Sequence, residues 1–223
     1  MPGPQGREER RERMRSRDIP APTLERLAGY LRCLSEIEPH EMEFISSEEL
    51  GKRTQCPAEL VRRDLSYFGE FGRRGVGYNV TLLRQTIARI LRLNQKQNAV
   101  LVGAGNLGMA LLAYPGWDRY NLRIVAAFDT DPEKIGRRLW GTEVYDAASI
   151  AARVPELDVK MAVLTVPAGA AQSTADQLVR AGIRGILNFA PVPISVPKGV
   201  VVRNVSFITE MAVLSYYTSV EEG

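Results

Sequence analysis

The sequence predicts an α/β protein built from two domains. Three observations along its 223 residues support this prediction. Two short helical segments are joined by a tight turn, a Gly-x-Gly-x-x-Gly turn follows an apolar strand, and strands and helices alternate regularly after it. A chain of this length can bury two modest hydrophobic cores.

The first 18 residues predict a disordered basic arm at 1–18. They contain six arginines and four acidic residues with almost nothing apolar, so they cannot build a core. Pro20 and Pro22 end the arm. Thr23 is then expected to cap a helix, because the apolar residues after it recur with a helical period. These residues are Leu24, Leu27, Ala28, Leu31 and Leu34.

A helix-turn-helix is predicted next. Ser46 and Glu49 form a capping box that opens a short helix through Arg53. A tight turn at 54–56 follows, and Pro57 suits the first position of the second helix. The residues of that helix expected to face inward are Leu60, Val61, Leu65 and Phe68. Those expected to face out are Glu59, Arg62, Arg63, Ser66 and Tyr67.

The glycine-rich segment 69–78 predicts the hairpin wing of a winged-helix domain. It carries Arg73 and Arg74 at its tip, where arginines can enter a minor groove or contact phosphates. An ordinary surface loop beside a small helical domain is the alternative. We therefore predict a winged-helix DNA-binding domain at 19–80, followed at 81–97 by a linker with a helix from Thr81 to Leu93.

Charge is divided unevenly between the two halves. Residues 1–97 hold 18 of the 29 Lys and Arg and 14 of the 26 Asp and Glu, a net +4, and the remainder is net −1. The basic half is the half without the nucleotide-binding turn. This excess is too mild to establish nucleic-acid binding by itself.

The turn at 103–108 predicts a Rossmann dinucleotide-binding domain at 98–204. It joins an apolar strand to a helix, where such a domain holds the pyrophosphate on backbone amides and the positive helix end. A second strand at 122–128 ends at Asp129, which is expected to bind a ribose diol and repel a 2′-phosphate. NAD(H) is therefore favoured over NADP(H). A glycine-rich turn in another α/β domain is the alternative. The cofactor candidates here are Gly103, Ala104, Gly105, Asn106, Leu107, Gly108 and Asp129.

Later strands extend a parallel sheet. Buried strands are predicted at 161–166 and 185–189, with a helix at 168–181 between them. Ligands of such sheets lie at the carboxyl ends of the strands. The residues predicted to line the site there are Thr165, Val166, Pro167, Asn188 and Phe189.

The last segment, 205–223, predicts a dimerisation helix. Apolar side chains surround it almost completely, so it needs more cover than one face supplies. Burial in a partner subunit and packing on its own domain are equal alternatives. The side chains are Phe207, Ile208, Met211, Val213, Leu214, Tyr216 and Tyr217.

The C-terminal half lacks the acid and base groups that a dehydrogenase needs. The only histidine, His40, lies in the N-terminal half. The C-terminal half also has no Tyr-x-x-x-Lys spacing that could replace it. The dinucleotide is therefore interpreted as a signal and the protein as no enzyme. A small NAD-dependent oxidoreductase and a CoA- or nucleotide-binding module are the alternatives.

Other classes of protein are excluded by simpler features. Cys33 and Cys56 have no metal-ligand spacing, so no metal is expected. No apolar stretch is long enough to span a membrane, and no signal peptide is recognisable. The sequence therefore predicts a cytoplasmic protein.

The chain resembles the Rex family of bacterial redox-sensing transcriptional repressors. The resemblance spans about residues 19–220, and its most specific segments are VRRDLSYFG at 61–69, RGVGY at 74–78, the glycine turn and GILNFAP at 185–191. It implies a homodimer with exchanged C-terminal helices that binds a pseudo-palindromic operator when NADH is scarce and leaves it when NADH accumulates. The Rossmann half is also similar to the CoA-binding domain of succinyl-CoA ligases.

The resemblance implies a role for each candidate residue. Arg62 and Arg63, with Ser66 and Tyr67 beside them, would reach the major groove, and Arg73 and Arg74 would serve the wing. The glycine turn and Asp129 would bind NAD(H). Tyr114 would lie near the nicotinamide, and Phe207 of the partner subunit would approach the same ring.

One position departs from the family pattern. In the family, an Asp at the start of the swapped helix exchanges between an Arg on the first helix and the Tyr near the nicotinamide. The corresponding residues here are Ser206, Arg32 and Tyr114. Serine cannot form that ion pair, so the resemblance carries over the architecture to this chain but not this exchange of ion pairs.

The nicotinamide itself offers another basis for a switch. It carries a positive charge only in NAD⁺, and burying a cation without an anion costs several kcal/mol. A pocket lined by Pro167, Phe189 and Phe207 of the partner subunit would therefore prefer the reduced form, NADH.

Overall fold

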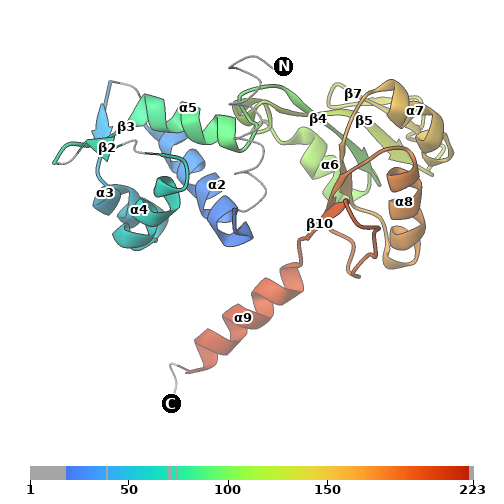
Figure 1. Cartoon of the computed structure of the whole chain (residues 1–223). Helices are drawn as coiled ribbons and strands as arrows, with labels where there is room; N and C mark the ends of the chain where they lie inside the picture. The colour runs from blue at the N-terminus through green and yellow to red at the C-terminus, as the bar shows by residue number, and fades with distance from the viewer. Residues whose placement is uncertain (1–18, 39, 70–71, 74, 221–223) are drawn as a thin grey trace. The chain divides into compact units, whose positions relative to one another are not determined.

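The chain divides into two compact units, Met1–Gln95 and Lys96–Gly223. The predicted arm at 1–18 and Arg74 fall outside the residues that the computed structural model describes. The described residues are 19–38, 40–69, 72–73 and 75–220 (Figure 1).

The described part of the N-terminal unit forms four helices and a small antiparallel sheet (Figure 1). The helices are α2 (Ala21–Glu36), α3 (Ser47–Thr54), α4 (Ala58–Ser66) and α5 (Val80–Ile90). The strands, in sheet order, are β1 (Phe44–Ile45), β3 (Gly77–Asn79) and β2 (Gly72–Arg73). All four helices contribute buried apolar side chains. The chain order of helix, turn, helix and hairpin is the one that the sequence predicted.

Local sequence determines where α3 begins and ends. The Ser46 hydroxyl accepts a hydrogen bond from the Glu49 amide at 3.0 Å, which confirms the predicted cap. Gln55 ends the helix in the left-handed region with a φ of 54°. Gly51 lets the following turn approach the helix, because a Cβ there would overlap the Cys56 carbonyl oxygen. α3 and α4 are therefore joined as closely as a helix-turn-helix requires.

The prediction that Thr23 caps α2 is wrong. The helix begins at Ala21, and Pro20 occupies the cap position without a side-chain hydrogen bond. The Thr23 hydroxyl is instead buried and donates to Asp64 at 3.1 Å. A long-range partner therefore takes the group that a local reading assigns to the cap.

Two further helix ends differ from the sequence prediction. Pro57 lies at the N-cap of α4, one position before the one expected for it. α5 begins at Val80, behind a cap in which the Asn79 side chain accepts from the Leu82 amide at 3.0 Å. It ends at Ile90, earlier than predicted, and the chain adopts a left-handed conformation soon afterwards.

The C-terminal unit is a sheet whose neighbouring strands are all parallel except β6 and β7. In sheet order the strands are β10 (Val201–Asn204), β9 (Gly185–Asn188), β8 (Met161–Leu164), β4 (Gln97–Val102), β5 (Leu122–Asp129), β7 (Thr142–Asp146) and β6 (Arg138–Leu139). The strand order reverses between β4 and β8, and ligands bind at the carboxyl ends of such a pair. β6, β7 and β10 are absent from the sequence prediction, because these short strands lack the continuous apolar run of a strand buried on both faces.

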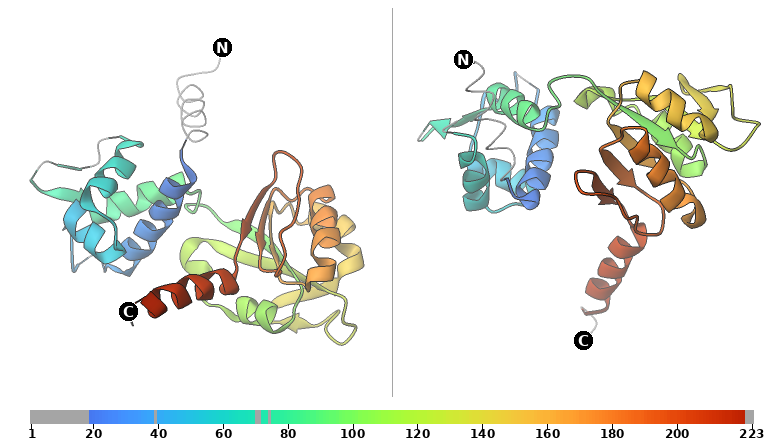
Figure 2. Two further views of the ribbon diagram at one scale, coloured as in Figure 1. Left: turned by 90° about the horizontal axis from the view of Figure 1, so that it is seen from below. Right: turned by 45° about the vertical axis from the view of Figure 1, so that its right-hand side comes forward.

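Different helices cover the two faces of this sheet (Figure 2). α7 (Ile150–Glu156) and α8 (Ala168–Arg180) pack on one face, in a core that includes Val100 and Val102 of β4. α6 (Asn106–Ala113) packs on the other face, in a core that includes Leu101. Consecutive residues of β4 thus point to opposite cores, as in a strand buried on both faces.

The last helix, α9 (Phe207–Val220), follows β10 and exposes its apolar side chains. The Ser206 hydroxyl accepts from the Thr209 amide at 3.2 Å and so caps the helix. The seven apolar side chains that the sequence singled out are 50–79 % exposed in the single chain. α9 therefore has little cover from the described part of its own domain. None of the described helices combines the length and apolarity that a membrane span needs.

Candidate functional site

The glycine turn after β4 has the geometry that its sequence predicts. Gly103 adopts a φ of +97°, and a Cβ there would lie 2.8 Å from the Thr165 carbonyl oxygen. A Cβ at Gly108 would overlap the Gly103 carbonyl oxygen. Gly105, in contrast, faces open space and forms the N-cap of α6. Two glycines thus close the turn, and the third leaves the amino end of α6 accessible to an anion.

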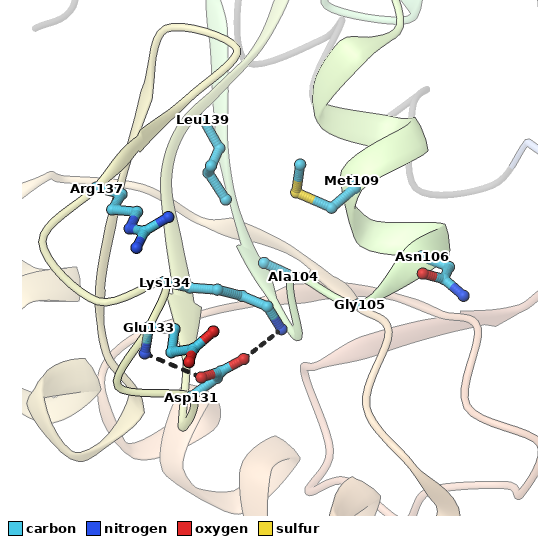
Figure 3. A pocket seen from close by; sticks show the side chains of 9 residues that line it. All are labelled: Ala104, Gly105, Asn106, Met109, Asp131, Glu133, Lys134, Arg137 and Leu139. Atoms are coloured by element: carbon cyan, nitrogen blue, oxygen red, sulfur yellow. Dashed lines mark hydrogen bonds and ion pairs between the residues drawn. The ribbon is translucent and has the colours of Figure 1, made fainter.

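A cavity of about 250 Å³ lies beside this turn (Figure 3). Three of the predicted cofactor residues line it, namely Ala104, Gly105 and Asn106. The other lining residues were missed by sequence reasoning: Met109, Asp131, Glu133, Lys134, Arg137 and Leu139. Most of them belong to the charged segment that directly follows Asp129, and its position after the second strand of the sheet is the signal that could have found them.

The Asp129 carboxylate organises the turn. One oxygen, Oδ2, accepts from the Ala104 amide at 2.7 Å, and Oδ1 accepts from the Asp131 amide at 2.9 Å. Lys134 Nζ lies 3.5 Å from Oδ2. The side chain is only 11 % exposed. Asp129 therefore ties β5 to the glycine turn, and its oxygens are already bound within the chain.

Asp131 presents the more accessible carboxylate. Its side chain is 39 % exposed, lines the cavity and lies 3.2 Å from Lys134 Nζ (Figure 3). A hydrogen bond from the Glu133 amide, together with Lys134, holds the pKa of Asp131 below its usual value. With Glu133 and Arg137 also in the lining, the cavity contains acidic and basic groups side by side.

Two predicted site residues, Thr165 directly after β8 and Asn188 at the end of β9, stabilise loops. The Thr165 hydroxyl contacts the Gly103 carbonyl oxygen at 2.7 Å, across the strand-order reversal. Asn188 is 1 % exposed; its amide nitrogen donates to Val192 O and Asn204 Oδ1, and its oxygen accepts from the Ala190 amide. Neither side chain lines the cavity, and Val166 and Pro167 do not either.

The predicted aromatic residues form two pairs outside the cavity. Tyr114 is 54 % exposed and stacks edge-on against Trp117, with 5.6 Å between the ring centroids. Phe189 and Phe207 of the same chain lie 6.4 Å apart. The structure thus brings Phe189 and Phe207 together, whereas Tyr114 pairs with Trp117.

The predicted DNA-binding residues of α4 are exposed, as the helical period required. Arg62 donates to Ser47 and Glu48 of α3, whereas the Arg63 side chain has no hydrogen-bond or ion-pair partner among the described residues. Ser66 and Tyr67 lie at the end of the helix, with Tyr67 42 % exposed. In the hairpin, Arg73 is exposed on β2.

A buried charge network fixes the inner side of α4. Asp64, 1 % exposed, accepts from Arg26 Nε at 2.6 Å, from the Tyr30 hydroxyl at 2.9 Å and from Thr23. Burial alone would raise the pKa of Asp64, but these hydrogen bonds outweigh burial and hold it below its usual value. Burial and the contact with Cys56 raise the pKa of Tyr30. The network binds α4 to α2.

The two remaining switch candidates lie in different units. Arg32 is exposed on α2, and Ser206 caps α9. No group of three or more potential metal ligands occurs among the described residues.

Known families match both halves of the chain. A model described as "CoA binding domain" matches residues 94–192, and one described as "Putative DNA-binding protein N-terminus" matches residues 18–66. A redox-sensing transcriptional repressor Rex from Thermus thermophilus is 47 % identical over 89 % of this chain and 93 % of its own length. The corresponding protein from Chloroflexus aggregans is 42 % identical, over 93 % and 98 %.

Solved structures match most of the chain. A crystal structure of RSP in complex with β-NAD⁺ and operator DNA aligns with a TM-score of 0.85 and 34 % identity, covering 92 % of this chain and 94 % of that one. A structure of RSP with β-NADH aligns with a TM-score of 0.83 and 33 % identity, covering 92 % and 96 %.

Proposed function

This chain belongs to the Rex family of redox-sensing transcriptional repressors, and we propose that it binds operator DNA when NADH is low and leaves the operator when NADH binds. Its relatives are repressors and not enzymes. The observation that carries the proposal is the combination, in one chain, of an open glycine turn beside a cavity and a second helix with exposed arginines.

The cofactor is NAD(H), with its pyrophosphate on the amides at the start of α6. The open face of Gly105 supports this assignment, because a side chain there would occupy the approach to those amides. The adenosine ribose then meets Asp131, whose carboxylate is exposed to the cavity, while Asp129 holds the turn. This modifies the sequence prediction, which gave the ribose to Asp129.

The reduced cofactor is preferred at the nicotinamide end. The ring lies near Phe189, Phe207 of the partner subunit and Tyr114. Burying it there without an anion costs more for the cationic nicotinamide of NAD⁺ than for the neutral dihydronicotinamide of NADH. The pyrophosphate is bound in the same way in NAD⁺ and NADH. The preference for NADH over NAD⁺ therefore arises at the nicotinamide end. Shifting a two-state repressor almost completely takes up to about 5.5 kcal/mol of differential affinity, which two sites of a dimer can share.

Operator DNA is read by α4 and the wing. Arg62, Arg63, Ser66 and Tyr67 face the major groove, and Arg73 and Arg74 contact the backbone or the minor groove. A homodimer presents two such helices to a pseudo-palindromic site. Because operators lie on the chromosome, this function places the protein in the cytoplasm.

The dimer is formed by α9. Its apolar side chains are exposed all round, which supports burial in a second copy and an exchange of helices between subunits. Ser206 starts this helix as a neutral cap, so Arg32 and Tyr114 have no acidic partner at that position.

The test is operator affinity measured at defined NADH:NAD⁺ ratios. We expect NADH, but not NADPH, to weaken binding; an affinity that stays constant across the NADH titration would overturn the proposal. A thermal-shift series with NADH, NAD⁺ and CoA tests the match to the CoA-binding domain model, since the ligand that binds the folded state raises the melting temperature.

A further inference from the structure

The Arg62 guanidinium is held by a helix other than its own. Its Nη1 donates to the Ser47 hydroxyl at 2.7 Å and to Glu48 Oε1 at 2.8 Å. Ser47 in turn donates to Glu48 Oε2 at 3.3 Å. Ser47 and Glu48 form the first turn of α3, so the first helix of the helix-turn-helix fixes a side chain of the second.

The neighbouring arginine contrasts with it. The Arg63 side chain has no hydrogen-bond or ion-pair partner within the described ranges, and it is exposed. Arg63 can therefore adapt to whatever backbone or base lies near it, whereas Arg62 can present only the part of its guanidinium that Ser47 and Glu48 leave open.

The open part has a defined chemistry. A guanidinium carries five N–H donors in one plane, and two of them are on Nη1. With Nη1 directed to Ser47 and Glu48, the edge formed by Nε and Nη2 has no hydrogen-bond partner among the residues that the structure describes. Two parallel donors on such an edge match the O6 and N7 acceptors of guanine in the major groove.

The carboxylate of Glu48 has opposite effects on DNA affinity and on DNA specificity. A negative charge near phosphates lowers the affinity for every sequence. Its benefit must therefore lie in orientation, because a fixed guanidinium plane accepts one arrangement of acceptors and rejects others.

We propose that Glu48 and Ser47 make Arg62 a preset reader of one guanine in each half-site, so that Glu48 determines operator specificity without touching DNA. This inference rests on the proposed function. Glu48 is thereby a positioning residue for the recognition helix.

The experiment compares the full-length protein with E48Q in the absence of NADH. A duplex enriched from a random library by the wild-type protein serves as probe, together with duplexes in which each G·C pair is replaced in turn. We expect E48Q to lose roughly five- to tenfold of the preference at one G·C pair per half-site. Affinity for unrelated duplexes should stay the same or rise, because the variant removes a negative charge.

E49Q is the matched control. Glu49 follows Glu48 on the same helix and pairs with Arg53 at 2.6 Å, not with an α4 residue. E49Q removes the same negative charge as E48Q. It should therefore change the affinity for all duplexes alike and keep the preference at the G·C pair. S47A should lose part of the preference at the same pair. R62A should lose all of it, and adding E48Q to R62A should change nothing further at that pair.

Identical base-pair preferences of E48Q and E49Q would overturn the inference and leave the proposed function standing. So would an R62A variant that weakens all duplexes equally and lowers the salt slope by about one, since that result identifies a phosphate contact. A wild-type protein that enriches no sequence would overturn the proposed function and the inference together. Glu48 and Arg62 are 68 % and 49 % exposed in their side chains, so thermal unfolding of the variants should match the wild type.

Discussion

Two aspartates anchor the two functional elements of this chain, and they are held by different kinds of donor. Asp64, on the inner side of α4, is bound by the side chains of Arg26, Tyr30 and Thr23. Asp129, beside the glycine turn, is bound by the Ala104 amide, a second backbone amide and one lysine.

The difference determines what each anchor depends on. Asp64 is 1 % exposed, so its charge is stable only while its three side-chain partners remain in place. Asp129 depends on the path of the backbone, which it also stabilises, and its side chain is 11 % exposed at the edge of a cavity. α4 is therefore positioned by a buried ion pair, and the glycine turn by main-chain hydrogen bonds.

Removing the buried anchor should have the largest effect. D64A leaves the guanidinium of Arg26 without its partner, and breaking a buried pair in this way costs about 3 kcal/mol of unfolding free energy. Urea unfolding should show this loss in the N-terminal unit, with operator binding lost as well. E59Q, an exposed change on the same helix, should stay within about 0.5 kcal/mol of wild type. A loss below about 1 kcal/mol for D64A would mean that the packing of α4 replaces the network.

Acid should remove the same contribution without a mutation. The folded state lowers the pKa of Asp64, so its contribution is complete above the unfolded pKa of about 3.9 and is lost as pH falls through the lower folded pKa. The stability difference between wild type and D64N should therefore be constant near neutral pH and should shrink in acid. Urea titrations at several pH values measure it. A difference that grows in acid would contradict the role of the carboxylate.

The nucleotide turn can be tested with a pair of substitutions two residues apart. D129N weakens charge-assisted hydrogen bonds to the turn, each worth about 1.5–3 kcal/mol, so both the melting temperature and the NADH affinity should fall. D131N removes the accessible carboxylate, so NADH affinity should fall while the melting temperature stays near wild type. Calorimetric titration measures the NADH affinity of both variants, and thermal unfolding measures their melting temperatures. An NADH affinity of D131N equal to that of the wild type would indicate that Asp129, and not Asp131, contacts the ribose.

Sequence reasoning succeeded where the information is local. The cap at Ser46 and the close approach of Gly108 to the Gly103 carbonyl oxygen each depend on neighbours within a few residues, and the structure confirms them. It failed where a partner is distant. The Thr23 hydroxyl binds a carboxylate 41 residues away, and the Arg62 guanidinium binds a serine 15 residues away. Neither pairing has a periodicity or a motif, because tertiary packing alone creates it.

The smallest effect is expected at Ser206, a neutral counterpart of the two aspartates that also fixes the start of an element. Asp caps helices as well as Ser does, so S206D should leave α9 intact, whereas S206A should cost it about 0.5–1 kcal/mol. The resemblance to the family pairs an acid at this position with Arg32, and an exposed ion pair contributes about 0.2–1 kcal/mol.

S206D should therefore enlarge the NADH-induced loss of operator affinity by up to about fivefold, and R32A should cancel the gain. The measurement is the ratio of operator dissociation constants with and without NADH. Wild-type behaviour in S206D, combined with no effect of R32A, would show that Arg32 takes no part in the switch of this chain. The nicotinamide end would then account for the whole response.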